Sequence, residues 1–108
     1  MMDDLKAALD ATGYKFAHFG WAKDAAERRQ DHGVYSEDGQ NPHWEDNHRA
    51  AHAIQGTVDY FTRDDSGTPQ EAIEAALNGL ESCSWYLNTI QLEEDTGFIH
   101  YEWVFEVV

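Results

Sequence analysis

Histidines and acids gather in one short segment that could bind a metal ion. His48 and His52 are four residues apart, a spacing that would place both imidazoles on one face of a helix, and His43 is close by. The segment has no cysteine pair and no HExxH glutamate, and Asn41-Pro42 just before it favours a turn over a helix. We therefore interpret these histidines as exposed loop residues and predict no metal site.

Nucleophilic chemistry has one candidate, the single cysteine. Cys83 lies in LESCSW, where no lysine or arginine is near enough in the chain to lower the pKa of its thiol. A cysteine in such surroundings is usually a small core residue, and a lone one is consistent with a reducing compartment. The serines lack a GxSxG context and the glycines form no phosphate-binding loop. The sequence therefore predicts no catalytic residue, no cofactor and no enzyme.

Two acidic runs are candidates for holding a divalent cation. They are Asp64-Asp65 and Glu93-Glu94-Asp95. Adjacent side chains in a strand point to opposite faces, so we interpret both runs as solvated turns.

Trp44 is a candidate of another kind. It lies in a polar stretch without the periodicity of a strand or helix that could cover a large aromatic ring. Two interpretations remain open: the indole folds back onto the core, or it contacts a partner.

The composition indicates one folded domain, residues 1–108. With 42% hydrophobic and 13% aromatic residues the chain can close a core. The formal net charge of -14 repels phosphate backbones and anionic lipids. No apolar run reaches the roughly 20 residues of a membrane span, and the first residues are acidic where a signal peptide is basic. We expect a soluble protein that does not bind nucleic acid by charge attraction.

Charge is unevenly distributed along the chain. The seven lysines and arginines all fall within the first 63 residues, whereas residues 64–108 carry ten acids and no lysine or arginine. Like charges repel and weaken the compact state, so the asymmetry indicates a surface with a function. A solvated acidic face that keeps the protein soluble explains it equally well.

The first half of the chain predicts one helix followed by strands. Apolar residues recur at helical spacing from Met2 to Leu9, and Gly13 can adopt the left-handed conformation that ends a helix. Next come a strand over residues 14–21, a loop over 22–32, a strand over 33–39 that ends in an Asp38-Gly39 turn, an unpatterned stretch over 40–50 and a strand over 51–62.

A second helix is predicted to begin at Thr68-Pro69-Gln70-Glu71. Thr68 can cap backbone NH groups, and Pro69 sits where its missing NH costs nothing. An apolar stripe then recurs at helical spacing, with polar residues on the opposite side. The stripe consists of Ile73, Ala76, Leu77 and Leu80, and the opposite side of Glu71, Glu74, Asn78 and Glu81.

The last third predicts a hairpin. Strands over residues 85–94 and 98–108 are joined by a turn at Asp95-Thr96-Gly97, and the second alternates almost perfectly between apolar and polar side chains. The order of elements is α-β-β-β-α-β-β. We therefore predict an α+β fold with two helices packed on one face of a small, largely antiparallel sheet.

Several segments resemble small proteins encoded among the tail and neck genes of long-tailed bacteriophages and prophages. They are GVYSEDG, GTVDYFTRDDSGTPQEAIEAALNGL, WYLN and EEDTGFIHYEWVFEV, and the similarity covers nearly the whole chain. The sequence is most similar to the tail terminator group. The resemblance implies a non-enzymatic protein of the virion tail or neck, assembled in the host cytoplasm. Another neck, tail-completion or head-tail joining protein is the alternative within the same resemblance.

The resemblance also implies an assembly. Copies of a tail terminator form a hexameric ring that caps the tail tube, contacts the head-tail connector protein and lets DNA pass without specific binding. Open strand edges can contact a neighbouring subunit, and a head-to-tail contact closes into a ring when its rotation permits. We expect Glu71, Glu74 and Glu81 to repel DNA in the lumen, and Trp44 to contact the tail tube protein or an adjacent subunit.

Two functions from other classes are compatible with the sequence. An acidic DNA mimic would inhibit a host nuclease or restriction enzyme with carboxylates in place of phosphates, as a monomer or dimer with salt-sensitive binding. A small α+β enzyme with an aromatic pocket is the weaker alternative, because the sequence offers no set of acid, base and nucleophile. Oligomeric state separates the mimic from the terminator.

Overall fold

The computed structural model describes residues 2–20, 28–42 and 52–108. Their elements are α1 (Met2–Ala11), β1 (Phe16–His18), β2 (His32–Pro42), β3 (His52–Thr62), α3 (Thr68–Asn78), β4 (Cys83–Glu93) and β5 (Phe98–Val107). This order confirms the predicted α-β-β-β-α-β-β arrangement. Within these ranges no helix is long and apolar enough to cross a membrane.

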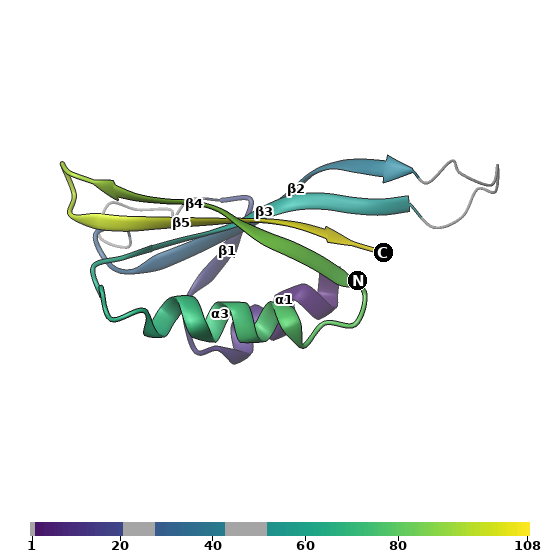
Figure 1. Ribbon diagram of the computed structural model, residues 1–108, viewed down its shortest axis with the longest axis horizontal. Helices are drawn as coiled ribbons and strands as arrows, with labels where there is room; N and C mark the ends of the chain where they lie inside the picture. Colours follow the sequence, from purple (N-terminus) through teal and green to yellow (C-terminus); the bar gives the residue numbers. More distant parts are fainter. Residues whose placement is uncertain (1, 21–27, 43–51) are drawn as a thin grey trace.

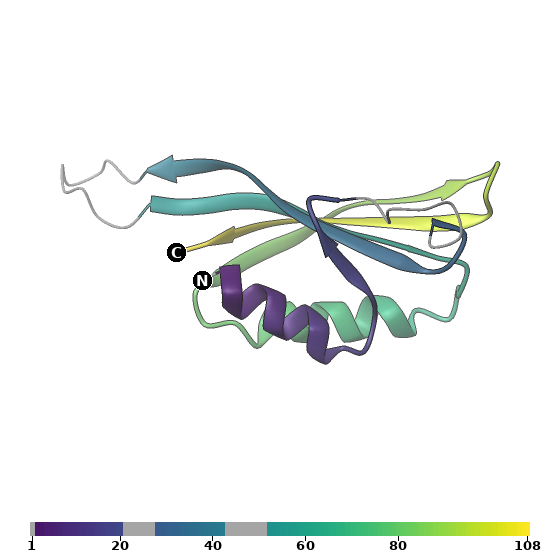
Figure 2. The same ribbon diagram turned by 180° about the vertical axis from the view of Figure 1, so that it is seen from behind.

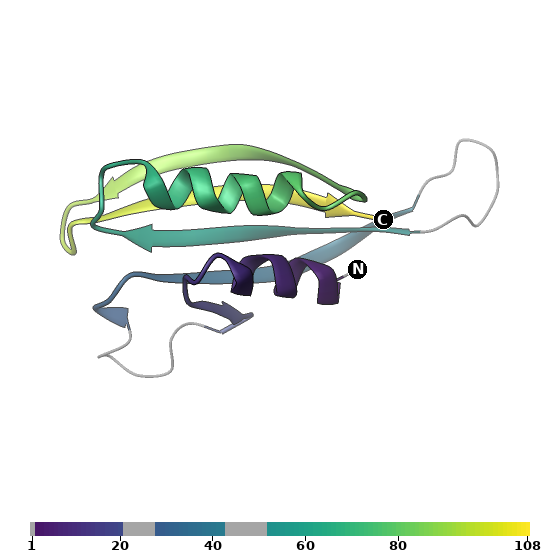
Figure 3. The same cartoon turned by 90° about the horizontal axis from the view of Figure 1, so that it is seen from below.

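The strands form one sheet in the order β1-β2-β3-β5-β4. β1 and β2 are parallel, and the other neighbouring pairs are antiparallel. Figures 1 and 2 show both helices on the same face of this sheet. From below, α3 lies across β5 and β4, and α1 lies across β2 (Figure 3). The predicted α+β fold is therefore confirmed, including the placement of both helices.

The core lies between the sheet and the two helices. α1 contributes Leu5 and Leu9 and α3 contributes Ile73 and Leu77, each with no exposed surface. The facing sheet side chains are fully or almost fully buried and come mainly from the two central antiparallel strands: Val58, Tyr60, Tyr101, Trp103, Phe105 and Val107. Their alternation confirms the predicted inward face of β5. The opposite face, here called the helix-free face, carries the sheet side chains that point away from α1 and α3.

The predicted turn at Asp38-Gly39 is wrong, because β2 continues through it to Pro42. Glu37 pairs with Gly56 and Gly39 with Gln55, so Asp38 is an extra residue that forms a β-bulge. A Cβ atom at Gly56 would collide with the backbone oxygen of Ser36 and the ring of Phe105. The pair Asp38-Gly39 suits a β-bulge as well as a tight turn, so the sequence pattern does not distinguish the two.

The predicted strand over residues 14–21 is shorter than expected. Only Phe16–His18 pair with β2, and Phe19 has a φ of 63°, which turns the chain away from the extended conformation. The loop predicted over 22–32 and the unpatterned stretch over 40–50 lie for the most part outside the described residues. Of the described parts, His32 and residues 40–42 already belong to β2, whereas residues 28–31 precede that strand.

The second helix begins where the sequence predicts, but with a different cap. Gly67 is the N-cap in a left-handed conformation, with a φ of 87°, and makes no side-chain capping bond. Thr68 is already the first helical residue, and its NH donates to the Ser66 hydroxyl over 3.2 Å. The prediction that Thr68 caps the helix is therefore wrong, because the residue before it, Gly67, occupies the N-cap position.

Candidate functional site

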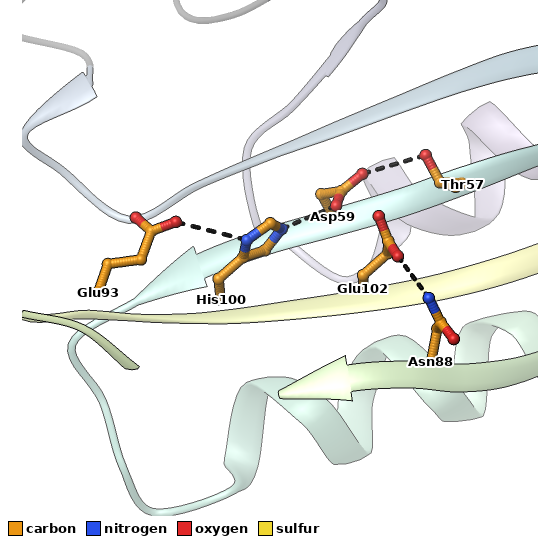
Figure 4. Close-up of polar contacts among 6 residues, drawn as sticks. All are labelled: Thr57, Asp59, Asn88, Glu93, His100 and Glu102. Carbon is orange, nitrogen blue, oxygen red and sulfur yellow. Dashed lines mark hydrogen bonds and ion pairs between the residues drawn. The ribbon is translucent and has the colours of Figure 1, made fainter. Parts of the chain in front are cut away.

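The helix-free face carries a cross-strand network of polar side chains (Figure 4). His100 on β5 lies between two carboxylates from the neighbouring strands. Its Nε2 is 2.7 Å from Asp59 Oδ1 on β3, and its Nδ1 is 3.5 Å from Glu93 Oε2 on β4. The Thr57 hydroxyl donates to Asp59 over 3.1 Å. The network therefore links three neighbouring strands at one end of the sheet.

The surroundings of His100 favour its charged form. The hydrogen bond with Asp59 raises the pKa of the imidazole above its usual value, and burial opposes this more weakly. The charges of Asp59, Glu93 and Glu102 raise the pKa further. An imidazolium here neutralises part of the negative charge on this face.

An aromatic ring stacks against the His100 imidazole. The Phe61 ring stacks on His100 with centroids 4.1 Å apart and on His32 with centroids 4.8 Å apart. His32 Nδ1 is 2.7 Å from the backbone oxygen of Gln30, so this nitrogen donates. The stack fixes the ring plane of His100, so the imidazole is held in position beside Asp59.

Arg63 closes the same end of the sheet. Its guanidinium lies 3.9 Å above the centre of the Phe98 ring and donates to the backbone oxygens of Arg29 and Thr96, over 2.6 and 3.1 Å. Asp31 accepts bonds from the Thr62 hydroxyl and the Arg63 backbone NH. Arg63 thus joins the segment before β2 to the turn between β4 and β5.

Further along the helix-free face the carboxylates are bonded to neutral amides. Asn88 Nδ2 on β4 donates to Glu102 over 2.8 Å, and Gln55 Nε2 on β3 donates to Glu106 over 3.0 Å. The amides orient these carboxylates and bring no charge of their own. Glu102 and Glu106 on β5 are therefore held in fixed directions by the neighbouring strands.

The residues singled out from the sequence are not brought together. Trp44 lies outside the described residues. Glu71 and Glu81 are exposed, whereas Glu74 is partly buried and accepts a 2.9 Å bond from the Trp103 indole NH. Of the three glutamates predicted to face the lumen, only Glu71 and Glu81 are exposed on the surface.

The prediction that Glu74 and Asn78 lie on the polar side of α3, opposite the apolar stripe, is wrong for Glu74, which is partly buried, whereas Asn78 is exposed as predicted. Asn78 Oδ1 accepts a 3.0 Å bond from the Trp85 indole NH, just as Glu74 accepts from Trp103. Both positions follow the buried residues Ile73 and Leu77 by one residue, or about 100° of helix rotation. They lie at the border of the stripe, where a polar side chain reaches the sheet.

Cys83 is partly buried, and burial raises the pKa of its thiol, which disfavours the nucleophilic thiolate. A hollow of about 260 Å³ near it is lined by Ser84, Trp85 and Tyr86 among others. A second hollow, of about 400 Å³, lies between the helices and is lined mostly by alanines. Ser84 and Glu106 both line the first hollow, whereas the described lining of the second hollow contains no base.

Other candidates from the sequence are bonded locally or lie elsewhere. Hydrogen bonds from the side chain of Ser66 and from its backbone NH, the latter over 2.9 Å, lower the pKa of the Asp64 carboxyl. Glu93 begins the turn into β5. His43 and His48 lie outside the described residues. Among the residues that the structure describes, no three metal-ligating side chains are grouped to hold an ion.

The sequence analysis did not identify the Asp59–His100–Glu93 arrangement. The alternation of β5 placed His100 on the polar face, but the register between strands was needed to place the carboxylates beside it.

No protein-family model matches the sequence, and a search of curated proteins found no match either.

Proposed function

We propose that this protein is a structural component of a long-tailed bacteriophage, a tail terminator. Its copies form a hexameric ring that caps the tail tube and joins it to the head-tail connector protein, at the neck of the virion. The observation that carries this proposal, beside the resemblance of the sequence, is the acidic helix-free face. Neither α1 nor α3 lies on this side of the sheet (Figure 1), which carries Asp59, Glu93, Glu102 and Glu106, and residues 64–108 contain no lysine or arginine.

The physical argument is electrostatic. A ring through which a genome passes must not hold the DNA, and a wall of carboxylates repels its phosphates. Hydrogen bonds from Asn88 and Gln55 orient Glu102 and Glu106, and these neutral amides bring no positive charge of their own. We therefore assign the lumen to the helix-free face. On α3, Glu74 accepts a hydrogen bond from the Trp103 indole, which leaves Glu71 as the candidate on this helix, while Glu81 lies in the turn that follows it.

Native mass spectrometry of the purified protein, followed by electron microscopy with tail tubes, tests the ring. We expect a closed ring, alone or on tube ends, and tubes that stop growing when the protein is added. A monomer that neither assembles nor binds tubes overturns the proposal. A ring found at the head connector alone would favour another neck or head-tail joining protein.

The lumen is tested with two matched sets of variants. Glu102→Gln with Glu106→Gln removes two charges from the helix-free face, and Glu71→Gln with Glu81→Gln removes two from the helical side. We expect DNA to be retained by rings of the first variant and not by rings of the second. Equal behaviour of the two rings would contradict this placement of the lumen.

The acidic face also fits a DNA mimic, because its carboxylates lie in one plane at strand spacing. A mimic would stay a monomer or dimer and bind a basic nuclease with an affinity that falls as salt rises. Titration against a nuclease at two ionic strengths, in parallel with the assembly experiment, separates the two functions.

A further inference from the structure

β4 is an edge strand that lacks the usual protection against pairing. Among the residues that the structure describes, it bonds only to β5, so its other side presents backbone NH and C=O groups. It has eleven residues, contains no proline, and carries no charge from Cys83 to Leu92. The strand at the opposite edge, β1, has only three residues. A bulge at Asn88 leaves Thr89–Glu93 as a regular five-residue segment.

Apolar side chains are exposed along this segment. Ile90 is 52% and Leu92 is 64% exposed. Ile90 pairs with Tyr101 and Leu92 with Ile99, which places both on the side of the sheet that the helices cover. β4 runs past the N-terminal end of α3 (Figure 1), so the helix does not cover them. Exposed neighbouring aliphatic side chains on an open edge are typical of an interaction surface.

The other side of the same segment is acidic. Glu93 belongs to β4, and Asn88 on β4 reaches Glu102, so both carboxylates lie beside the edge (Figure 4). Glu94 and Asp95 follow directly in the turn. The edge thus combines an apolar side, an unpaired backbone and an acidic side.

We propose that Thr89–Glu93 binds an extended segment of a partner protein as an added strand, in which apolar and basic side chains alternate. The apolar side chains of this segment cover Ile90 and Leu92, and the basic ones face Glu93 and Glu102. Backbone hydrogen bonds supply affinity, and the alternation supplies specificity. This inference does not depend on the virion role proposed above.

Charge decides against pairing between the β4 strands of two copies. Such a pair would bring the two acidic sides together with no basic residue from either strand. An extended segment with basic side chains gains from the same carboxylates that repel a second β4.

The first experiment uses a synthetic peptide of about nine residues, the length of a long strand. It alternates lysine and valine, with blocked termini, and is added to the full chain. We expect hydrogen exchange by NMR to slow at those amides of Thr89–Glu93 that do not bond to β5. Methylating alternate backbone nitrogens of the peptide should weaken binding at least about tenfold, because the added strand then cannot donate. Replacing its lysines by glutamates should abolish binding.

Three variants of the protein locate the site. Ile90→Thr and Leu92→Thr keep the net charge and a strand-forming residue, and we expect each to weaken peptide binding about tenfold. Tyr86→Thr is the matched control, since Tyr86 is 57% exposed on the same strand outside the segment. It should leave the affinity unchanged.

Two results would overturn the proposal. Equal binding of the methylated peptide would show charge attraction without strand addition. Protection of the same amides without peptide, together with a doubled mass that is favoured by salt, would make a second copy the occupant. Failure of the chain to form rings has no bearing on either readout, so the two proposals fail separately.

Discussion

The two faces of β5 show how one strand serves stability and surface chemistry at once. On the helix-covered side, Trp103 and Phe105 are buried against α1 and α3. On the helix-free side, His100 and Glu102 are held by hydrogen bonds that cross to the neighbouring strands. Successive residues of β5 thus contribute alternately to the stability of the core and to the chemistry of the surface. Burial of large apolar side chains stabilises the fold, whereas the partly exposed carboxylates contribute less and keep part of their surface open to a partner.

The largest expected effect is on the covered side. Replacing Trp103, which has no exposed surface, by alanine should lower the free energy of unfolding by about 3–5 kcal/mol, because it leaves a cavity between sheet and helices. Denaturant unfolding measures this change. Tyr86→Ala, at an exposed position of β4, is the control and should change the value by about 0.5 kcal/mol or less. A loss below about 1 kcal/mol for Trp103→Ala would mean that the covered face does not dominate stability.

An intermediate effect is expected where a carboxylate reaches the covered side. Glu74→Ala removes the acceptor of the Trp103 indole NH and should cost about 1–3 kcal/mol. Glu71→Ala, on the same helix but exposed, should have almost no effect. Equal losses for the two variants, measured by thermal or denaturant unfolding, would show that the indole bond is unimportant.

A smaller effect is expected from pH on the helix-free side. The folded protein raises the pKa of His100, so the stability that its protonated form contributes is complete below the unfolded value of about 6.5. It is lost as the pH rises through the higher folded value. The free energy of unfolding of the natural protein should therefore fall in this window relative to His100→Gln. A constant difference across the window would contradict the role of the Asp59 bond.

The smallest effect is expected from Glu102→Gln. The new side chain can still accept from Asn88, so the unfolding free energy should change by about 0.5 kcal/mol or less. A loss as large as that of Glu74→Ala would erase the contrast between the two faces. Chemical denaturation of Glu102→Gln and Glu74→Ala under the same conditions measures the two losses of unfolding free energy.

Periodic patterns in the sequence were enough to predict most of the fold. The alternation of residues 98–108 and the stripe from Ile73 to Leu80 predicted β5 and α3 correctly, since burial on one side imposes its period on the residues. The patterns were less informative at the ends of helices and strands and at irregular positions such as β-bulges. Asp38-Gly39 signals a turn and a bulge equally, and the cap at Gly67 depends on a backbone angle that the residue types Thr-Pro do not specify.

The sequence by itself determined the composition of each face: which residues of a strand share a side, how much charge the chain carries, and where the basic residues stop. Tertiary structure alone decided which side chains meet. His100 is 41 residues from Asp59 in the chain, and Glu74 is 29 from Trp103. Such contacts depend on strand register and on the placement of a helix against the sheet. These are properties of the packed chain, because no local pattern encodes the distance between residues that far apart.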